Sequence, residues 1–260
     1  MRILALLALG AALTLPATAA LAEKIRVGVT PGPHAQIMEK VREEAKAAGL
    51  EIEILEFSDY VVPNAALAAG DLDANSFQHQ PYLDNQIADR GYDLVVIGKT
   101  VTFPLGLFSA KIKSLDALPE KARVAIPNDP TNGGRALILL ASQGLITLRD
   151  GAGLAATPLD IEKNPKKLRI VELDAAQLPR SLNDVDIAAI NGNYALEAGL
   201  DPTHDALAQE AADGPYANVI AVRKADKDKP WANSLVNVYQ SAKVKSFIES
   251  TFKGALIPAW

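Results

Sequence analysis

The segment from Pro127 to Arg135 joins a polar turn to an arginine. An apolar strand is expected to end at Pro127 and a helix to begin near Asn132, which places Arg135 in the first helical turn. A positive charge is unfavourable there unless an anion faces it, and the free N–H groups of a helix start also attract an anion. Because a guanidinium suits a carboxylate bidentately, Arg135 is a candidate carboxylate-binding residue. The alternative interpretation is an arginine that is solvated or paired with an acidic side chain.

A second segment, Asn75 to Tyr82, carries aromatic rings beside a hydrogen-bonding group. Phe77 and Tyr82 offer flat apolar walls, and His79 lies between them in the sequence. Aromatic residues beside a turn also fill ordinary protein cores, so core packing is the alternative interpretation.

Two asparagines follow the apolar stretch 187–190. Asn191 and Asn193 thus lie at the carboxyl end of an expected strand, where ligands bind in open α/β sheets. Ordinary Asn-Gly turn chemistry is the alternative. Together, the three segments offer an arginine for a carboxylate, amides for polar groups and rings for an apolar tail. That combination suits a free amino acid with an uncharged side chain.

The sequence lacks the usual patterns of catalytic and metal sites. It contains no cysteine, and His34, His79 and His204 have no second ligand at metal-binding spacing. No Gly-x-Ser-x-Gly or Walker pattern occurs, and the glycines at 133 and 134 lack the spacing of a dinucleotide loop. We therefore expect no metal, no cofactor and no enzymatic activity.

Composition and charge narrow the class of partner. The 260 residues carry a formal net charge of −5, and their Lys and Arg are scattered rather than clustered. A nucleic acid or an anionic membrane surface is therefore not an expected partner. With 49% hydrophobic residues, the chain can build one large or two modest domains.

The first 22 residues have the pattern of a secretory signal peptide. A basic start is followed by an apolar run, 3–15, that is short for a membrane span, and Ala20-Leu21-Ala22 fits the small-x-small cleavage rule. We expect cleavage after Ala22. No later stretch is apolar and long enough to cross a bilayer, so the mature chain is expected to be soluble.

Strands and helices alternate along the rest of the chain, which predicts an α/β fold with mostly parallel sheets covered by helices. Strands are expected at 24–30, 51–57, 73–76, 93–99, 123–127, 168–173, 186–190 and 218–223, and helices at 34–48, 64–69, 132–143, 194–198, 231–239 and 244–252.

The alternation restarts in mid-chain, which predicts two lobes. The chain is expected to cross between them at 100–108 and to return at 214–218. Lobe 1 then comprises 23–102 and 216–260, and lobe 2 comprises 103–215. A cleft between two lobes is a common place for a ligand.

Several separated motifs, taken in order, resemble the NlpA/MetQ family of methionine-binding proteins over essentially the whole mature chain. They are Val27-Gly-Val-Thr-Pro-Gly-Pro-His34, Asn75-Ser-Phe-Gln-His79 with Pro81-Tyr-Leu83, Pro127-Asn-Asp-Pro-Thr-Asn132 with Gly134-Arg135, Ile190-Asn-Gly-Asn-Tyr-Ala195 and Ile257-Pro-Ala-Trp260.

The resemblance implies a type-II periplasmic binding protein fold, with the ligand in the cleft between two lobes. It further implies that aromatic rings surround the methionine side chain, that an arginine holds its carboxylate, and that the remaining polar groups bind its amino and carboxylate groups. By motif, the rings are those of Tyr60, Phe77 and Phe103, and the arginine is Arg135. The remaining polar groups are His79, Tyr82, Asn132, Asn191 and Asn193, with Asn218 as a further candidate.

The resemblance also implies partners and a location. The expected partners are methionine and an inner-membrane ABC transporter permease, with the receptor acting as a monomer. Many family members carry a lipidated cysteine after the signal peptide, and this chain has no cysteine. A soluble receptor is retained only inside an outer membrane, so the periplasm is the expected location. A receptor for another small amino acid or a small organic anion is the alternative function.

Overall fold

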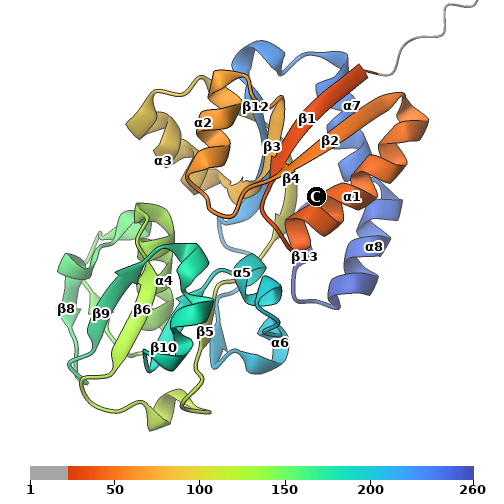
Figure 1. Ribbon diagram of the computed structural model, residues 1–260. Coiled ribbons are helices and arrows are strands. Elements are labelled where there is room, and N and C mark those ends of the chain that lie inside the picture. Colours follow the sequence, from red (N-terminus) through yellow and green to blue (C-terminus); the bar gives the residue numbers. More distant parts are fainter. Residues whose placement is uncertain (1–22) are drawn as a thin grey trace, which may run out of the picture.

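The computed structural model describes residues 23–260, which form two α/β units connected by two chain crossings. Figure 1 shows them one above the other, with the early and late parts of the chain together in the upper unit. The predicted signal peptide lies outside the described residues. We call the two units unit A and unit B, after their sheets.

Sheet A has six strands in the order β13-β4-β12-β3-β1-β2. Their bounds are β1 Glu23–Val29, β2 Leu50–Glu56, β3 Ala74–His79, β4 Leu94–Thr102, β12 Ala217–Arg223 and β13 Ile257–Pro258. Strand β1 runs parallel to β2 and β3, whereas β12 lies antiparallel between β3 and β4. The returning chain is therefore built into the middle of the first sheet, which ties the two ends of the sequence into one unit.

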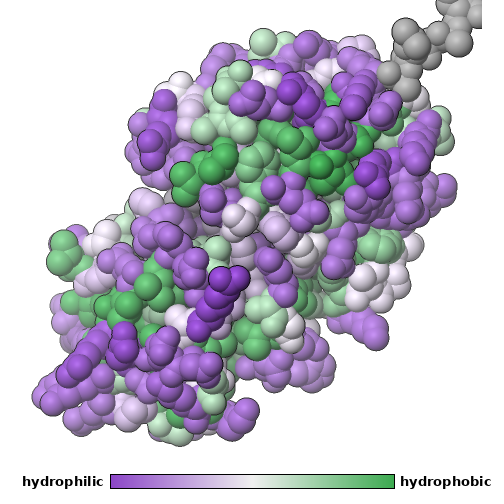
Figure 2. All heavy atoms as spheres, in the orientation of Figure 1, coloured by the Kyte–Doolittle hydropathy of each residue, from purple (hydrophilic) through white to green (hydrophobic). Residues whose placement is uncertain are grey.

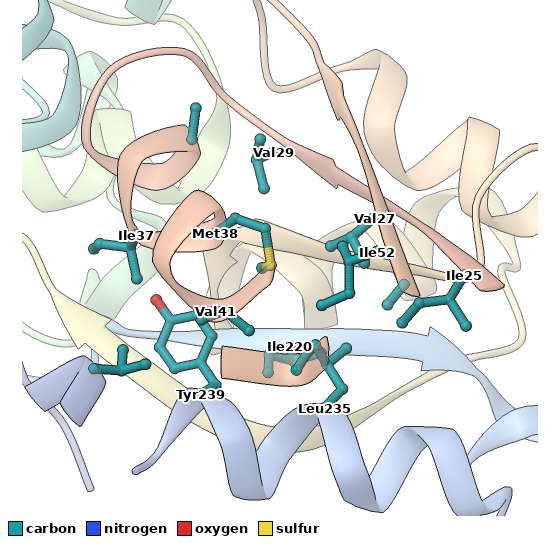
Figure 3. Packing of buried hydrophobic residues seen from close by; sticks show 14 of the residues in the cluster. Ile25, Val27, Val29, Ile37, Met38, Val41, Ile52, Ile220, Leu235 and Tyr239 are labelled. Atoms are coloured by element: carbon teal, nitrogen blue, oxygen red, sulfur yellow. The ribbon is translucent and has the colours of Figure 1, made fainter. Parts of the chain in front are cut away.

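Helices cover both faces of sheet A (Figure 1), and an apolar core fills the space beneath them. The helices are α1 Pro33–Ala45, α2 Val62–Ala69, α3 Gln80–Arg90, α7 Pro230–Tyr239 and α8 Ala242–Phe252. Helix α1 buries Ile37, Met38 and Val41 on one face, the spacing that an amphipathic helix requires. Figure 3 shows these side chains meeting Val27 of β1 and Leu235 of α7. Burying each such side chain contributes about 1.5–3 kcal/mol, so this core fixes unit A as a rigid support.

Sheet B has five strands in the order β11-β5-β10-β6-β9, and a separate pair joins β7 to β8. The strands are β5 Gly106–Phe108, β6 Arg123–Pro127, β7 Thr147–Leu148, β8 Ile161–Lys163, β9 Arg169–Leu173, β10 Ile187–Ile190 and β11 Ala208–Gln209. The helices of unit B are α4 Pro130–Ser142, α5 Gly192–Glu197 and α6 Pro202–Asp205. Both α4 and α5 begin directly beyond the carboxyl ends of central strands, β6 and β10.

The α/β class predicted from the sequence is confirmed, but the expectation of mostly parallel sheets is wrong. In each sheet two pairings are parallel, while three in sheet A and two in sheet B are antiparallel. The antiparallel pairings come from β12, which returns from unit B, and from short edge strands such as β5, β11 and β13. Strands of two or three residues leave no detectable periodicity in a sequence.

Most expected elements are present with shifted ends. The start of the helix expected at 132–143 moves to Pro130, and the strand expected at 73–76 extends to His79. Helix α3 was not expected, because its first turn lies inside a segment rich in polar and aromatic residues.

The surface of both units is mostly polar. Figure 2 shows hydrophilic side chains over much of one face of the molecule, with apolar atoms in smaller patches among them. Within residues 23–260, no helix has both the length and the hydropathy needed to cross a membrane.

Candidate functional site

A small cavity of about 20 Å³ lies between units A and B, so the side chains that line it lie close together. Unit A and the crossing segment after β4 contribute Tyr60, Phe77, Gln78, His79, Tyr82, Phe103 and Asn218, and unit B contributes Asn132, Arg135, Asn191 and Asn193. All eight residues predicted for the site, and also Phe103 and Asn218, line this one cavity.

One side of the cavity is aromatic. We call Tyr60, Phe77, Tyr82 and Phe103 the aromatic wall. Tyr60 lies 5.9 Å from Phe77 and 6.0 Å from Tyr82 between ring centroids, and Phe77 and Tyr82 meet edge-on at 6.1 Å. These distances fall in the range of favourable aromatic pairs. Contacts between the rings of Tyr60, Phe77 and Tyr82 therefore hold most of this wall together.

Buried amides tie the strand that carries Phe77 to α2. Asn64 of α2 and Gln78 of β3 exchange two hydrogen bonds of 2.7 Å each. Asn75 donates to Asn64 over 2.9 Å and accepts from Gln78 over 2.9 Å. This network satisfies groups that would be costly to bury alone, and it fixes β3, which carries Phe77, against α2.

The other side of the cavity is made of amides and a guanidinium. We call Asn132, Arg135, Asn191 and Asn193 the amide wall. Asp129 caps α4 by accepting from the Asn132 N–H over 2.9 Å, and its carboxylate also accepts from the Asn132 side-chain amide. Asn132 Oδ1 in turn accepts from Asn191 Nδ2 over 2.8 Å. The starts of α4 and α5 are thereby linked, so the amide wall is also held in place before any ligand arrives.

His79 connects the two walls in a defined tautomer. Its Nδ1 accepts from the Tyr82 N–H over 3.1 Å, so Nε2 carries the proton and donates to Asn132 Oδ1 over 3.1 Å. Burial, with a smaller contribution from the positive charge of Arg135, lowers the pKa of His79 to about 3. His79 is therefore a neutral hydrogen-bond donor at physiological pH.

Two further hydrogen bonds cross from unit A to unit B. The Tyr60 hydroxyl donates to Asn193 Oδ1 over 2.6 Å, and the Tyr194 hydroxyl donates to the Ser58 carbonyl over 3.3 Å. Together with the His79–Asn132 bond, they hold the two units close around the cavity. The structure thus represents a closed arrangement.

Arg135 does not lie in the first turn of its helix, as the sequence predicted. Because α4 begins at Pro130, Arg135 is its sixth residue and lies in the second turn, where the helix N-terminus opposes it less. An anion does face it, but this anion is Glu210, which follows β11. Arg135 Nε donates to the two carboxylate oxygens of Glu210 over 3.0 and 2.9 Å, and Nη2 forms a further contact with Oε1. The ion-paired alternative is therefore correct for this edge of the guanidinium.

Other contacts fix the plane of the Arg135 guanidinium. Nη2 donates to the Phe103 carbonyl over 2.8 Å, and the guanidinium carbon lies 4.2 Å from the centroid of the Tyr216 ring. The Arg135 residue is 3% exposed. Among residues 23–260, Nη1 has no hydrogen-bond partner, which leaves this edge of the group for a ligand.

Two buried amide atoms of the amide wall also lack partners within residues 23–260. They are Asn191 Oδ1, an acceptor, and Asn193 Nδ2, a donor. A buried polar atom without a partner costs about 1–3 kcal/mol. Six other buried side-chain atoms within residues 23–260 also lack a partner, but only Asn191 Oδ1 and Asn193 Nδ2 belong to residues that line the cavity. An acceptor and a donor beside a free guanidinium edge match the ammonium and carboxylate of an amino acid.

The glycine pair before Arg135 has a packing role. A Cβ at Gly134 would lie 2.3 Å from the Leu154 carbonyl oxygen, and one at Gly133 would lie 2.9 Å from the Pro127 carbonyl oxygen. The glycines thus allow close approach of backbone to α4, and they form no phosphate loop. Among residues 23–260, no group of three or more His, Asp or Glu side chains is arranged to hold a metal ion.

Sequence reasoning missed two residues of the site. Gln78 was inside a predicted segment but was not selected, although a buried polar residue on a strand beside Phe77 and His79 is a usable signal. Glu210 lies 75 residues from Arg135, in a polar stretch without a pattern, and no local signal could have found it.

Comparison with known proteins shows one consistent likeness. The family model described as NlpA lipoprotein matches residues 25–260. D-methionine-binding lipoprotein MetQ of Salmonella typhimurium is 50% identical over 239 residues, which cover 91% of this chain and 88% of that protein.

Two solved structures are similar over both units. A nutrient binding protein from Burkholderia cenocepacia bound to methionine is 56% identical, with a TM-score of 0.89, and the match covers 91% of this chain and all of that one. A periplasmic substrate-binding protein of an ABC transporter from Coxiella burnetii is 52% identical, with a TM-score of 0.88, over 90% of this chain and all of that one.

Proposed function

The chain belongs to the NlpA lipoprotein family, and from this premise we propose that it is the substrate-binding protein of a methionine ABC importer. It captures methionine outside the cytoplasmic membrane and delivers it, chemically unchanged, to the transporter. The names of the relatives support both the ligand and the type of transporter.

One observation carries this proposal: a cavity between units A and B is lined both by an aromatic wall and by a wall with unsatisfied amides and a free guanidinium edge. Methionine has the same division, a polarisable thioether chain at one end and a zwitterion at the other. Each thioether–aromatic contact contributes about 0.3–1.5 kcal/mol. The cavity size excludes long peptides when the two units are closed.

The proposed orientation of the ligand follows from the free atoms. The thioether chain lies against Tyr60 and Phe77, with Phe103 at the edge of the aromatic wall. The carboxylate accepts from Arg135 Nη1 and Asn193 Nδ2, and the ammonium donates to Asn191 Oδ1. His79, Tyr82 and Asn132 contribute by fixing this arrangement as much as by direct contact.

Binding is proposed to close the two units about the chain crossings. The segments between β4 and β5 and between β11 and β12, residues 103–105 and 210–216, are the proposed hinge. Hydrogen bonds such as Tyr60–Asn193 exist only when the units meet, and a ligand that contacts both walls favours that state. Lobe 1 then comprises 23–102 and 216–260, and lobe 2 comprises 103–215.

The proposed location and partner complete the assignment. We propose a periplasmic protein that is soluble after cleavage near Ala22 and acts as a monomer on an inner-membrane permease. Periplasmic fractionation with N-terminal sequencing tests the location, and the expected chain starts at or near Glu23. Recovery only from detergent-solubilised membranes would contradict it.

The test of the function is calorimetric titration of ligand-stripped protein with L-methionine, D-methionine and leucine, preceded by native mass spectrometry of the fresh preparation. We expect one methionine isomer to bind at one site per chain, more tightly than leucine. A folded protein that binds neither isomer, or that binds an inorganic or dicarboxylic anion more tightly, would overturn the proposal in favour of another receptor of the same fold.

A further inference from the structure

Glu210 is a half-buried acid that contacts the site without lining the cavity. Its side chain is 13% exposed, and it pairs with Arg135, which does line the cavity. Glu210 Oε1 also accepts from the Leu105 N–H over 3.0 Å, and the Glu210 N–H donates to the Leu105 carbonyl over 3.0 Å. The carboxylate is therefore fixed to the crossing segment on one side and to Arg135 on the other.

The pair changes the charge that a ligand meets. A lone Arg135 would give the cavity one positive charge, but Glu210 cancels it at hydrogen-bond distance. The next carboxylate, Asp129, lies behind Asn132 and adds negative rather than positive potential. His79 is neutral, and the remaining polar lining groups are amides and hydroxyls.

We propose that Glu210 is a positioning and specificity-determining residue, which orients Arg135 and makes the cavity selective for net-neutral zwitterions over net anions of the same shape. This inference rests on the proposed function, because it assumes that the ligand is an α-amino acid. The Nε–Nη2 edge of the guanidinium is occupied by Glu210 and by the Phe103 carbonyl, so only Nη1 meets the ligand carboxylate. A ligand without an ammonium then brings an uncompensated negative charge into a closed, low-dielectric site.

The test compares two ligands that differ in charge and little in shape. Methionine is a zwitterion, and its 2-hydroxy analogue, 2-hydroxy-4-(methylthio)butanoate, replaces the ammonium by a hydroxyl and is a monoanion. The measured quantity is the ratio of their affinities by calorimetric titration, in wild type and in Glu210→Gln. The glutamine variant keeps an acceptor for the Leu105 N–H and for Arg135 but removes the charge.

The wild type is expected to prefer methionine strongly, and Glu210→Gln to reduce this preference about tenfold or more, because the guanidinium charge is no longer cancelled. Glu210→Asp, which keeps the charge, should retain most of the preference even if both affinities fall. A matched control is Asp160→Asn in unit B. Asp160 is also paired with an arginine, Arg149, and is 12% exposed, but it lies away from the cavity. Its removal should leave the ratio unchanged.

The possible results test the role of Glu210 separately from the proposed function. If Glu210→Gln weakens both ligands equally, or moves the ratio by less than twofold, Glu210 is only structural and the inference is wrong, while methionine binding stands. If the wild type is folded but binds neither compound, the proposed function fails and the inference fails with it. A change in ratio that also occurs in Asp160→Asn would reflect net charge of the whole protein and would equally overturn the proposal.

Discussion

The two walls of the cavity are built by different means. The aromatic wall rests on unit A, where Phe77 belongs to a strand that the amide network of Asn64, Asn75 and Gln78 ties to α2. The amide wall lies at the starts of α4 and α5 in unit B, where capping contacts and the Glu210 pair orient it. From this difference we propose a division of tasks, in which unit A recognises apolar shape and unit B recognises charge. Closure brings the two together.

The largest expected effect comes from breaking the charged part of the amide wall. Arg135→Ala should weaken methionine binding by about 2–5 kcal/mol, or roughly 30- to several thousand-fold. It should also lower the melting temperature, because Glu210 is left as a half-buried charge without its partner. Titration and thermal melts of the same preparations measure both quantities.

A double variant distinguishes the two effects. Arg135→Met combined with Glu210→Gln removes both charges, so most of the stability should return while methionine binding stays lost. Binding of methionine to Arg135→Ala within about threefold of wild type, under roughly 0.7 kcal/mol, would mean that the ligand carboxylate lies elsewhere.

A smaller effect is expected on the aromatic wall. Phe77→Leu removes a ring but keeps an apolar side chain, and we expect methionine to bind about tenfold more weakly, through lost thioether–aromatic contact. Leucine binding should change less, so the preference for methionine over leucine should narrow. Phe108→Leu is the control, since Phe108 is a buried ring in the core of unit B outside the cavity. Equal losses for both ligands would argue against the division of tasks.

Loss of the hydrogen bond between the two walls is expected to weaken methionine binding less than loss of the Phe77 ring. Tyr60→Phe keeps the ring but removes the hydroxyl that donates to Asn193 Oδ1. One neutral hydrogen bond contributes about 0.5–1.5 kcal/mol, so affinity should fall a few-fold to about tenfold. Small-angle scattering should show a larger fraction of open protein at subsaturating ligand. An unchanged affinity would show that the bond follows closure without stabilising it.

The smallest of the expected effects, at pH values near neutrality, is the dependence of affinity and stability on pH. The closed state lowers the pKa of His79 to about 3, mainly by burial, whereas an exposed histidine titrates near 6.5. The open or unfolded state therefore binds a proton below pH 6.5 that the closed state rejects. Affinity and stability should be constant above that pH and should fall as the pH drops from 6.5 toward 3, by up to about 1.4 kcal/mol per unit.

His34 is a second buried histidine, and it serves as a comparison for His79. It is also buried, and burial lowers its pKa to about 3, but it packs against Phe103 and does not line the cavity. His34 should therefore contribute to the loss of stability in acid with little effect on affinity. Titrations at several pH values in His79→Gln, with His204→Ala as an exposed control, measure the separate contributions. A wild-type affinity that is flat down to pH 4.5 would rule out the His79 effect.

The sequence was most informative where the pattern is local. The strand–helix alternation, the apolar strand before Asn191 and the polar segment around His79 could all be recognised within ten residues or so. The two-lobed α/β fold predicted from them is confirmed by the likeness to solved structures over both units. Most predicted site residues lie near the end of a strand or the start of a helix, where a ligand is expected, but Phe77 lies within β3 and Arg135 lies in the second turn of α4.

What the sequence could not predict depends on distant partners. The orientation of β12 between β3 and β4 is set by the return of the chain from unit B, and no periodicity encodes it. The turn in which Arg135 lies depends on a helix start two residues earlier than expected, at Pro130. Its pairing with Glu210 depends on how β11 meets β5, since that pairing brings residue 210 to the Leu105 backbone.

The most direct test of the division of tasks is a crystal structure of the protein with methionine bound. We predict density for one methionine in the cavity between units A and B, with its thioether against Tyr60 and Phe77. Its carboxylate should lie within hydrogen-bond distance of Arg135 Nη1, with the Arg135–Glu210 pair intact, and its ammonium should face Asn191 Oδ1. A methionine in the reverse orientation, a carboxylate that displaces Glu210 from Arg135, or a ligand bound outside this cavity would contradict the account.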